Sequence, residues 1–141
     1  MTEKGFVARQ GAAPQTGADR IERFRVWIEE YATALETGDF GALDRLFAIE
    51  ATYRPGPFSA MLRGRRAIRS YLETLQSDRP SFAVTARALG VGSTYAVAHW
   101  VSGWRTGDAD AVEDGILLAA FDQFGRCTSL RAWAVTNDPG T

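Results

Sequence analysis

Apolar residues recur at helical spacing in the first half of the chain and alternate with polar residues in the second half. Between residues 19 and 37 they fall every three or four positions and share one face of a predicted helix: Ile21, Phe24, Ile28, Tyr31 and Leu35. Asp19, with Glu22 three residues later, predicts a capped start for this helix. Gly38 predicts its end.

Two further helices and a strand are predicted next. Asp39 begins a short helix whose apolar residues are expected to turn inward: Phe40, Leu43, Leu46 and Phe47. Residues 51–54 predict a strand, which Pro55 and Pro57 end because proline donates no ladder hydrogen bond. A third helix is predicted after Gly64, and Asp78-Arg79-Pro80 ends it. Its apolar face carries Ala67, Ile68, Tyr71, Leu72 and Leu75.

The remaining residues have the alternation of a sheet. Strands are predicted near residues 82–89, 95–105, 112–122 and 126–135, and glycine-containing turns separate them. Helices that are separate from a mostly antiparallel sheet predict an α+β fold. We expect residues 19–137 to form one domain, residues 1–18 a mobile tail, and residues 138–141 a short C-terminal tail.

Composition removes several classes of function. The 16 basic and 17 acidic residues give a net charge of −1, which offers no argument for a nucleic-acid or membrane partner. No apolar run approaches the ~20 residues of a membrane helix, and the start lacks the apolar core of a signal peptide, so a cytoplasmic protein is expected. The single cysteine, Cys127, and the single histidine, His99, exclude an internal disulfide and a Cys/His zinc cluster. Neither a metal nor an organic cofactor is expected.

Five short segments carry, through their order and spacing, a resemblance to a known family. They are YATALETGDF at 31–40, LFA at 46–48, RGRRAI at 63–68, DGI at 114–116 and FDQFGR at 121–126. Together they resemble the nuclear-transport-factor-2-like superfamily, and especially its SnoaL-like branch, which has the polyketide cyclase and ketosteroid isomerase-like fold. The resemblance covers residues 20–137. It implies a cone-shaped α+β barrel, in which three N-terminal helices pack on a curved, mixed, mostly antiparallel sheet around an apolar pocket.

The resemblance also directs attention to a few residues with chemistry. His99 is the leading general acid/base candidate because imidazole titrates near neutral pH, and the resemblance implies that it faces the cone. A structural histidine, hydrogen-bonded to a neighbour, is the alternative. Tyr31 or Tyr53 would hydrogen-bond a substrate oxygen, unless they only pack in the core. Glu113 or Asp114 would orient the imidazole, unless they are solvated strand ends.

Further residues are expected to line the pocket or a dimer contact. The expected pocket-lining set is Tyr53, Val101, Leu117, Ala132, Trp27 and Phe58. Trp100, Trp104 and Trp133 are expected on the sheet face away from the cone, where aromatic residues indicate a protein interface. The resemblance implies that this interface forms a homodimer, with cover by the tail or a loop as the alternative.

The known reactions of the superfamily match this chain only in part. Tyr31 falls at the oxyanion-binding tyrosine of ketosteroid isomerase, but Pro55 and Leu117 occupy the positions of its base and its second acid. Tyr53 matches a water-holding residue of limonene epoxide hydrolase, whose carboxylates are missing here. Scytalone dehydratase uses two histidines, and this chain has one.

Three functions therefore stay open. The first is a SnoaL-like, cofactor-independent isomerase, cyclase or lyase that acts on a small apolar molecule, with His99 as general acid/base. The second is a non-catalytic protein that binds such a molecule. The third is a structural or partner-binding dimer whose cone is filled by its own side chains.

Overall fold

A computed structural model of the protein describes residues 16–139. Most of the predicted N-terminal tail, residues 1–15, lies outside the described residues, as do residues 140–141. The elements are, in chain order, α1 (Gly17–Thr37), η1 (Phe40–Ala42), α2 (Leu43–Leu46), β1 (Phe47–Arg54), β2 (Leu62–Arg63), α3 (Arg65–Ser77), β3 (Ala83–Val91), β4 (Ala96–Thr106), β5 (Ala109–Phe121) and β6 (Cys127–Asn137).

Helix α1 begins slightly earlier than the sequence predicts. Thr16 is the N-cap: its hydroxyl accepts a hydrogen bond from the Asp19 amide at 3.0 Å, and the Asp19 carboxylate accepts one from the Thr16 amide. The predicted cap at Asp19 is therefore wrong, because Asp19 is the third residue of a capping box that Thr16 opens. Glu22 instead bonds Arg25 one turn further along the helix. Gly38 ends the helix as predicted, in the left-handed conformation at φ +75°.

The other helices match their patterns, and the strands extend past theirs. The inward residues predicted after Asp39 are buried, although a 3-10 turn and a four-residue helix replace one short helix. Helix α3 follows Gly64 as predicted. Strand β1 begins four residues before the predicted position, and the two-residue β2 was not predicted because it is too short to show a period.

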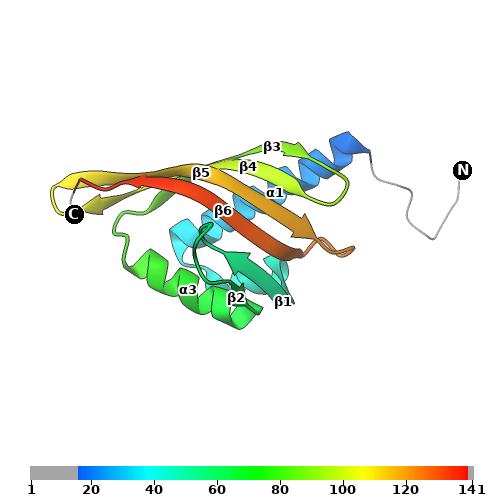
Figure 1. The fold of residues 1–141 in the computed structure, drawn as a ribbon, viewed down its shortest axis with the longest axis horizontal. Coiled ribbons are helices and arrows are strands. Elements are labelled where there is room, and N and C mark those ends of the chain that lie inside the picture. The colour runs from blue at the N-terminus through cyan, green and yellow to red at the C-terminus, as the bar shows by residue number, and fades with distance from the viewer. Residues whose placement is uncertain (1–15, 140–141) are drawn as a thin grey trace, which may run out of the picture.

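The six strands form one mixed sheet in the order β2-β1-β6-β5-β4-β3. Only the β1–β6 pair is parallel, and the sheet does not close on itself. Helix α1 packs along β3 and α3 packs on β1, so both helices cover the same face of the sheet (Figure 1). The fold is the predicted α+β cone. We call the face that meets α1 and α3 the inner face and the opposite one the outer face.

The register of the β4–β5 hairpin decides which side chains enter the cone. Thr106 pairs with Ala109 across a two-residue turn, so Ser102 lies opposite Glu113 and Trp100 lies opposite Gly115. Directly opposed residues of an antiparallel pair share one face. Alternate residues of β4 from Ala96 to Trp104 are buried, and these form the inner face of the strand.

The core fills the space between the inner face and the helices. Its centre is aromatic: the ring of Trp27 lies 5.2 Å from Tyr31 and 5.6 Å from Phe47, measured between centroids. The indole N–H of Trp27 donates to the Leu46 carbonyl at 2.9 Å, so its polar atom is satisfied inside the core. Cys127 is fully buried, and burial raises the pKa of its thiol to about 12. This thiol is a packing group.

At Gly115 the backbones of β5 and β6 approach so closely that a side chain has no room. A Cβ atom at this position would lie 2.2 Å from the Trp133 carbonyl oxygen and 2.6 Å from the Ala134 Cα. Gly115→Ala is expected to destabilise the protein by about 2 kcal/mol, because backbone atoms must move apart. Urea unfolding measures this cost. Gly103→Ala is the matched control, since its Cβ would meet only Ala111 O at an ordinary 3.5 Å. Equal stabilities of the two variants would contradict this account of the β5–β6 approach.

Candidate functional site

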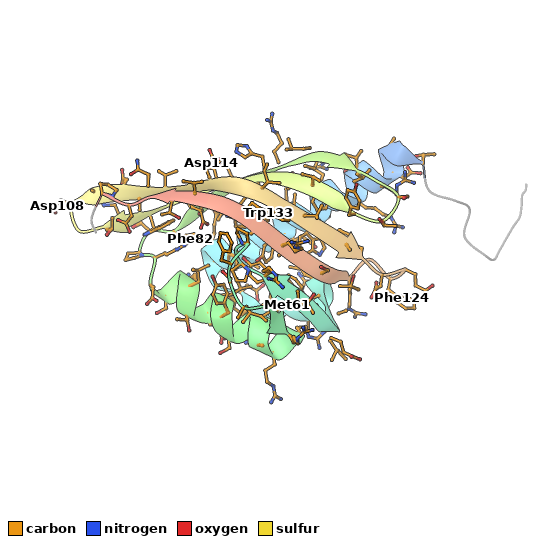
Figure 2. The ribbon with its side chains drawn as sticks, viewed as in Figure 1. Met61, Phe82, Asp108, Asp114, Phe124 and Trp133 are labelled. Atoms are coloured by element: carbon orange, nitrogen blue, oxygen red, sulfur yellow. The ribbon has the colours of Figure 1, made fainter. Side chains whose placement is uncertain are left out.

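A cavity of about 50 Å³ lies inside the cone, between the inner face, α1 and α3. Its walls are mainly apolar and include Leu35, Leu72, Leu75, Phe82, Trp100 and Leu117. Figure 2 shows Phe82 on the α3 side of the sheet, whereas Asp114 lies on the side away from α3. The described lining residues that carry a hydroxyl or a charge are Tyr31, Tyr53, Tyr71, Arg79 and Glu113.

Glu113 and Arg79 form an ion pair at this cavity. The Arg79 Nη1 atom lies 3.4 Å from Glu113 Oε1, and the two side chains are only 14% and 22% exposed. The hydroxyl of Ser102, which is buried opposite Glu113, donates to the same oxygen at 3.4 Å. The guanidinium of Arg79 also covers the Trp104 ring, 3.9 Å from its centroid. The two charges are thus held by protein groups rather than by bulk water.

Both hydrogen bonds that the structure gives the Glu113 carboxylate go to the same oxygen, Oε1. Among residues 16–139, no side chain or amide donates a hydrogen bond to Glu113 Oε2. Both contacts to Oε1 are long, since charge-assisted hydrogen bonds to a carboxylate ordinarily measure about 2.7–2.9 Å from a charged nitrogen and about 2.5–2.7 Å from a hydroxyl. The carboxylate is therefore anchored on one side and still able to accept a proton or a hydrogen bond on the other.

Tyr31 and Tyr53 bring neutral hydroxyl groups to the same cavity. Burial raises the pKa of both phenols well above the ordinary value, and the negative charge of Glu113 raises the pKa of each further. The positive charge of Arg79 opposes the rise in the pKa of Tyr53. The pKa of Tyr71 is also raised by burial, against the influence of Arg79. The tyrosines therefore stay protonated at neutral pH and can donate hydrogen bonds to an oxygen atom.

Five of the predicted site residues meet at this cavity. Tyr31, Tyr53, Glu113, Leu117 and Ala132 all line it, as expected from the inward faces of their elements.

His99 and Asp114 form the predicted pair, but on the outer face of the sheet rather than inside the cone. The His99 Nε2 atom lies 2.7 Å from Asp114 Oδ1, and the side chains are 36% and 62% exposed. Both residues lie on the outer face, because His99 pairs with Ile116 rather than with an inward residue of β5. The expectation that His99 faces the cone is wrong. Val101 pairs with Asp114 and is on the outer face for the same reason.

Trp27 and Phe58 do not line this cavity either. Trp27 is a core residue beside a separate hollow of about 150 Å³ near the start of α1, where Phe24 and Tyr95 also lie. Phe58 is fully exposed in the β1–β2 connection, where no pattern predicts the direction of a side chain.

The tryptophans divide between the two faces. Trp100 lines the cavity, 5.4 Å from the Tyr31 ring, and Trp104 lies beneath Arg79, so the prediction of a shared outer face is wrong for both. Trp133 does lie on the outer face, where it is 38% exposed and covered in part by Arg131. Two large rings bury more apolar area than His99 and Val101 would, which explains the orientation of β4.

Arg79, Tyr71 and Ser102 are site residues that sequence reasoning missed. Tyr71 was expected only as part of the apolar face of its helix, and nothing distinguished its hydroxyl from core packing. Ser102 alternates with two tryptophans, and this would have revealed it if the tryptophan face had been placed inward. Arg79 lies in the connection after α3, where no periodicity predicts the direction of a side chain.

Two general features of the described residues bear on function. Within residues 16–139, no helix is long and apolar enough to cross a membrane. In the same range, no group of three or more histidine, cysteine, aspartate or glutamate side chains is placed to hold a metal ion.

Comparison with known proteins identifies the family. The model of the SnoaL-like domain matches residues 28–129. The chain belongs to the SnoaL-like domain family. This places it in the nuclear-transport-factor-2-like superfamily, as its sequence segments indicate. A search of curated proteins finds no match.

Solved structures confirm the SnoaL-like fold. One similar structure is SalBIII, described as an epoxide hydrolase/cyclase-like enzyme in pyran ring formation in the polyether salinomycin. The two chains superpose with a TM-score of 0.71 over 83% of this chain and 93% of SalBIII, at 16% sequence identity. At this identity the likeness establishes the fold alone, and residues of the cavity must decide the function.

The buried tyrosines predict a loss of stability at alkaline pH. A phenol whose pKa is raised by folding stabilises the protein fully below the unfolded pKa of about 10, and this contribution is lost as the pH rises above it. The free energy of unfolding in urea should fall by about 1 kcal/mol for each of Tyr31 and Tyr53 between pH 9 and pH 11. Cys127 acts in the same direction.

Tyr53→Phe should reduce this fall, since phenylalanine cannot ionise in the unfolded chain. Tyr95→Phe is the matched control, because Tyr95 is 53% exposed. An alkaline fall of equal size in the Tyr53→Phe variant and the wild type would contradict the burial of this phenol.

Proposed function

We propose that this SnoaL-like protein is a cofactor-independent acid/base enzyme of the isomerase, cyclase or lyase type. Its substrate is a small, mostly apolar molecule that carries an oxygen atom. The observation that supports the proposal is the carboxylate of Glu113 at a cavity that Tyr31 and Tyr53 also line. Glu113 takes the place that the sequence had assigned to His99.

The chemistry follows from what each group can hold. The carboxylate of Glu113 can accept a proton from a C–H or O–H group of the substrate. The hydroxyls of Tyr31 and Tyr53 then stabilise the oxygen on which negative charge develops, without giving up their own protons. Glu113 returns the proton to a different atom of the same molecule. Such a rearrangement balances in atoms and electrons and needs no oxidant or reductant.

The surroundings of the carboxylate support this role. The inner face and the two helices shield the site, and apolar side chains make up most of its wall. Hydrogen bonds to a developing charge are worth more where water is excluded. SalBIII, which shares the fold, is described as an epoxide hydrolase/cyclase-like enzyme, and proton transfer to and from oxygen is compatible with that description.

A non-catalytic binding protein is the second candidate, and it is favoured because Pro55 and Leu117 stand where ketosteroid isomerase has its base and its second acid. The cavity of about 50 Å³ is far below the roughly 300–1,000 Å³ of sites that hold drug-sized ligands, so under either function the bound molecule is very small. Under this alternative, a small molecule would bind without conversion. The homodimer and the cytoplasmic location expected from the sequence remain proposals, and of the three tryptophans only Trp133 is placed for an outer-face contact.

Proton abstraction can be measured without knowing the natural substrate. Cyclohexanone in D2O exchanges its α-hydrogens when a base removes them, and proton NMR follows the loss of signal. The wild-type protein should accelerate this exchange over buffer. Glu113→Gln should reduce the acceleration about 100-fold or more, the usual contribution of a positioned base.

His99→Ala is the matched control, because the His99 ring lies on the outer face. It should keep the wild-type exchange rate. No acceleration by the wild-type protein, or equal rates for Glu113→Gln and the wild type, would reject the enzyme and leave the binding protein. A loss on His99→Ala alone would return the catalytic role to histidine.

A further inference from the structure

The cavity holds one positive and one negative group. Of the described residues that line it, Arg79 and Glu113 are the only charged ones. A guanidinium stays protonated at any ordinary pH, so Arg79 always brings a positive charge to the cavity. Alone, it would attract an anion. With Glu113 ionised 3.4 Å away, the pair is neutral in sum.

We propose that Glu113 is the determinant of charge selectivity in the cone: by neutralising Arg79, it restricts the substrate of the proposed enzyme to uncharged molecules. The charge selectivity is inferred from the geometry of the cavity alone. That the selected molecule is a substrate rests on the proposed function. A carboxylate-bearing molecule would meet the negative charge of Glu113. An ammonium ion would meet the positive charge of Arg79. A ketone, an epoxide or an alcohol avoids both penalties and still finds the tyrosine hydroxyls.

Arg79 cannot easily move its charge out of the cavity. Its guanidinium is stacked on Trp104, and its side chain is only 14% exposed. The backbone beside it is tied to the sheet, because the Pro80 carbonyl accepts a hydrogen bond of 2.8 Å from the Arg105 amide. Removal of Glu113 would therefore leave a buried positive charge without its partner, which is costly unless an anion replaces it.

The pairing is also loose enough for a ligand to compete with it. A fork of two short, parallel hydrogen bonds would saturate both groups. Here a single nitrogen of Arg79 meets Glu113, at 3.4 Å, and Ser102 shares the same oxygen. Both charged groups thus keep hydrogen-bonding capacity for a molecule in the cavity.

Acetate and acetamide test the proposal because they match in size and shape and differ in charge. Their binding can be titrated by NMR in a chloride-free buffer, with the indole N–H signals of Trp100 and Trp104 as reporters of the site. The wild-type protein should bind acetamide at least 10-fold more tightly than acetate. Glu113→Gln should bind acetate at least 10-fold more tightly than the wild type does and prefer it to acetamide.

Arg79→Gln is the reciprocal variant. It leaves Glu113 as the only charge at the cavity, so it should gain at least 10-fold in affinity for methylammonium and gain nothing for acetate. This arm alone decides the proposal if Glu113→Gln does not fold. No gain for acetate in a folded Glu113→Gln, or no gain for methylammonium in Arg79→Gln, overturns the proposal. Equal binding of acetate and acetamide by the wild type does so as well.

These titrations are independent of turnover. We call the two gains in affinity, for acetate in Glu113→Gln and for methylammonium in Arg79→Gln, a charge switch. A charge switch without any exchange of cyclohexanone would reject the enzyme and keep the selectivity. Exchange that depends on Glu113, without a charge switch, would keep the enzyme and reject the selectivity.

Discussion

The two-residue turn between β4 and β5 is the constraint on which the site depends. It pairs Thr106 with Ala109 and thereby sets every opposite pair along these two strands. A shift of one residue would exchange the faces completely, since side chains alternate with a period of two. In the observed register, Glu113 and Ser102 enter the cone together, and His99 and Asp114 leave it together. The identity of the candidate base therefore follows from a turn at the far end of the hairpin.

An ion pair inside an apolar cone costs free energy of desolvation, and the groups around Arg79 and Glu113 offset this cost. Desolvation of two charges can outweigh their attraction, so a buried pair needs additional partners. Ser102 supplies a hydroxyl to the carboxylate, and Trp104 supplies an aromatic face to the guanidinium. Apolar residues of similar size would serve stability equally well or better. The retention of charge at this place is more easily understood as a requirement of function than of folding.

Much of the fold could be predicted from the sequence because it depends on local patterns. The apolar period of α1, the glycine at its end and the turns between the long strands are each visible within about ten residues. The orientation of β4 was also within reach. With a two-residue turn at Gly107-Asp108, residue 99 must oppose residue 116, so His99 and Glu113 cannot share a face. The resemblance to other members of the superfamily led to the opposite assignment for His99.

The parts of the site that could not be predicted come from irregular segments. Arg79 reaches the cavity from the connection between α3 and β3, and its direction depends on Trp104 and Glu113, which are distant in sequence. Phe58 shows the same limit, since it lies in a loop and points to solvent. Tyr71 presents a different difficulty: all three tyrosines of the cavity have the pattern of core residues, and the resemblance drew attention to Tyr31 and Tyr53 but not to Tyr71.

A double-mutant cycle on Arg79 and Glu113 tests most directly that these two charges meet inside the cone. The free energies of unfolding of the wild type, Arg79→Met, Glu113→Gln and the double variant would be measured in urea, beside the same cycle on the exposed pair of His99 and Asp114. A coupling of at least about 1 kcal/mol is expected for Arg79 and Glu113, because their side chains are largely buried. A coupling of about 0.5 kcal/mol or less is expected for the exposed pair. Additive effects of Arg79→Met and Glu113→Gln would show that the cone does not enclose an ion pair of these two residues.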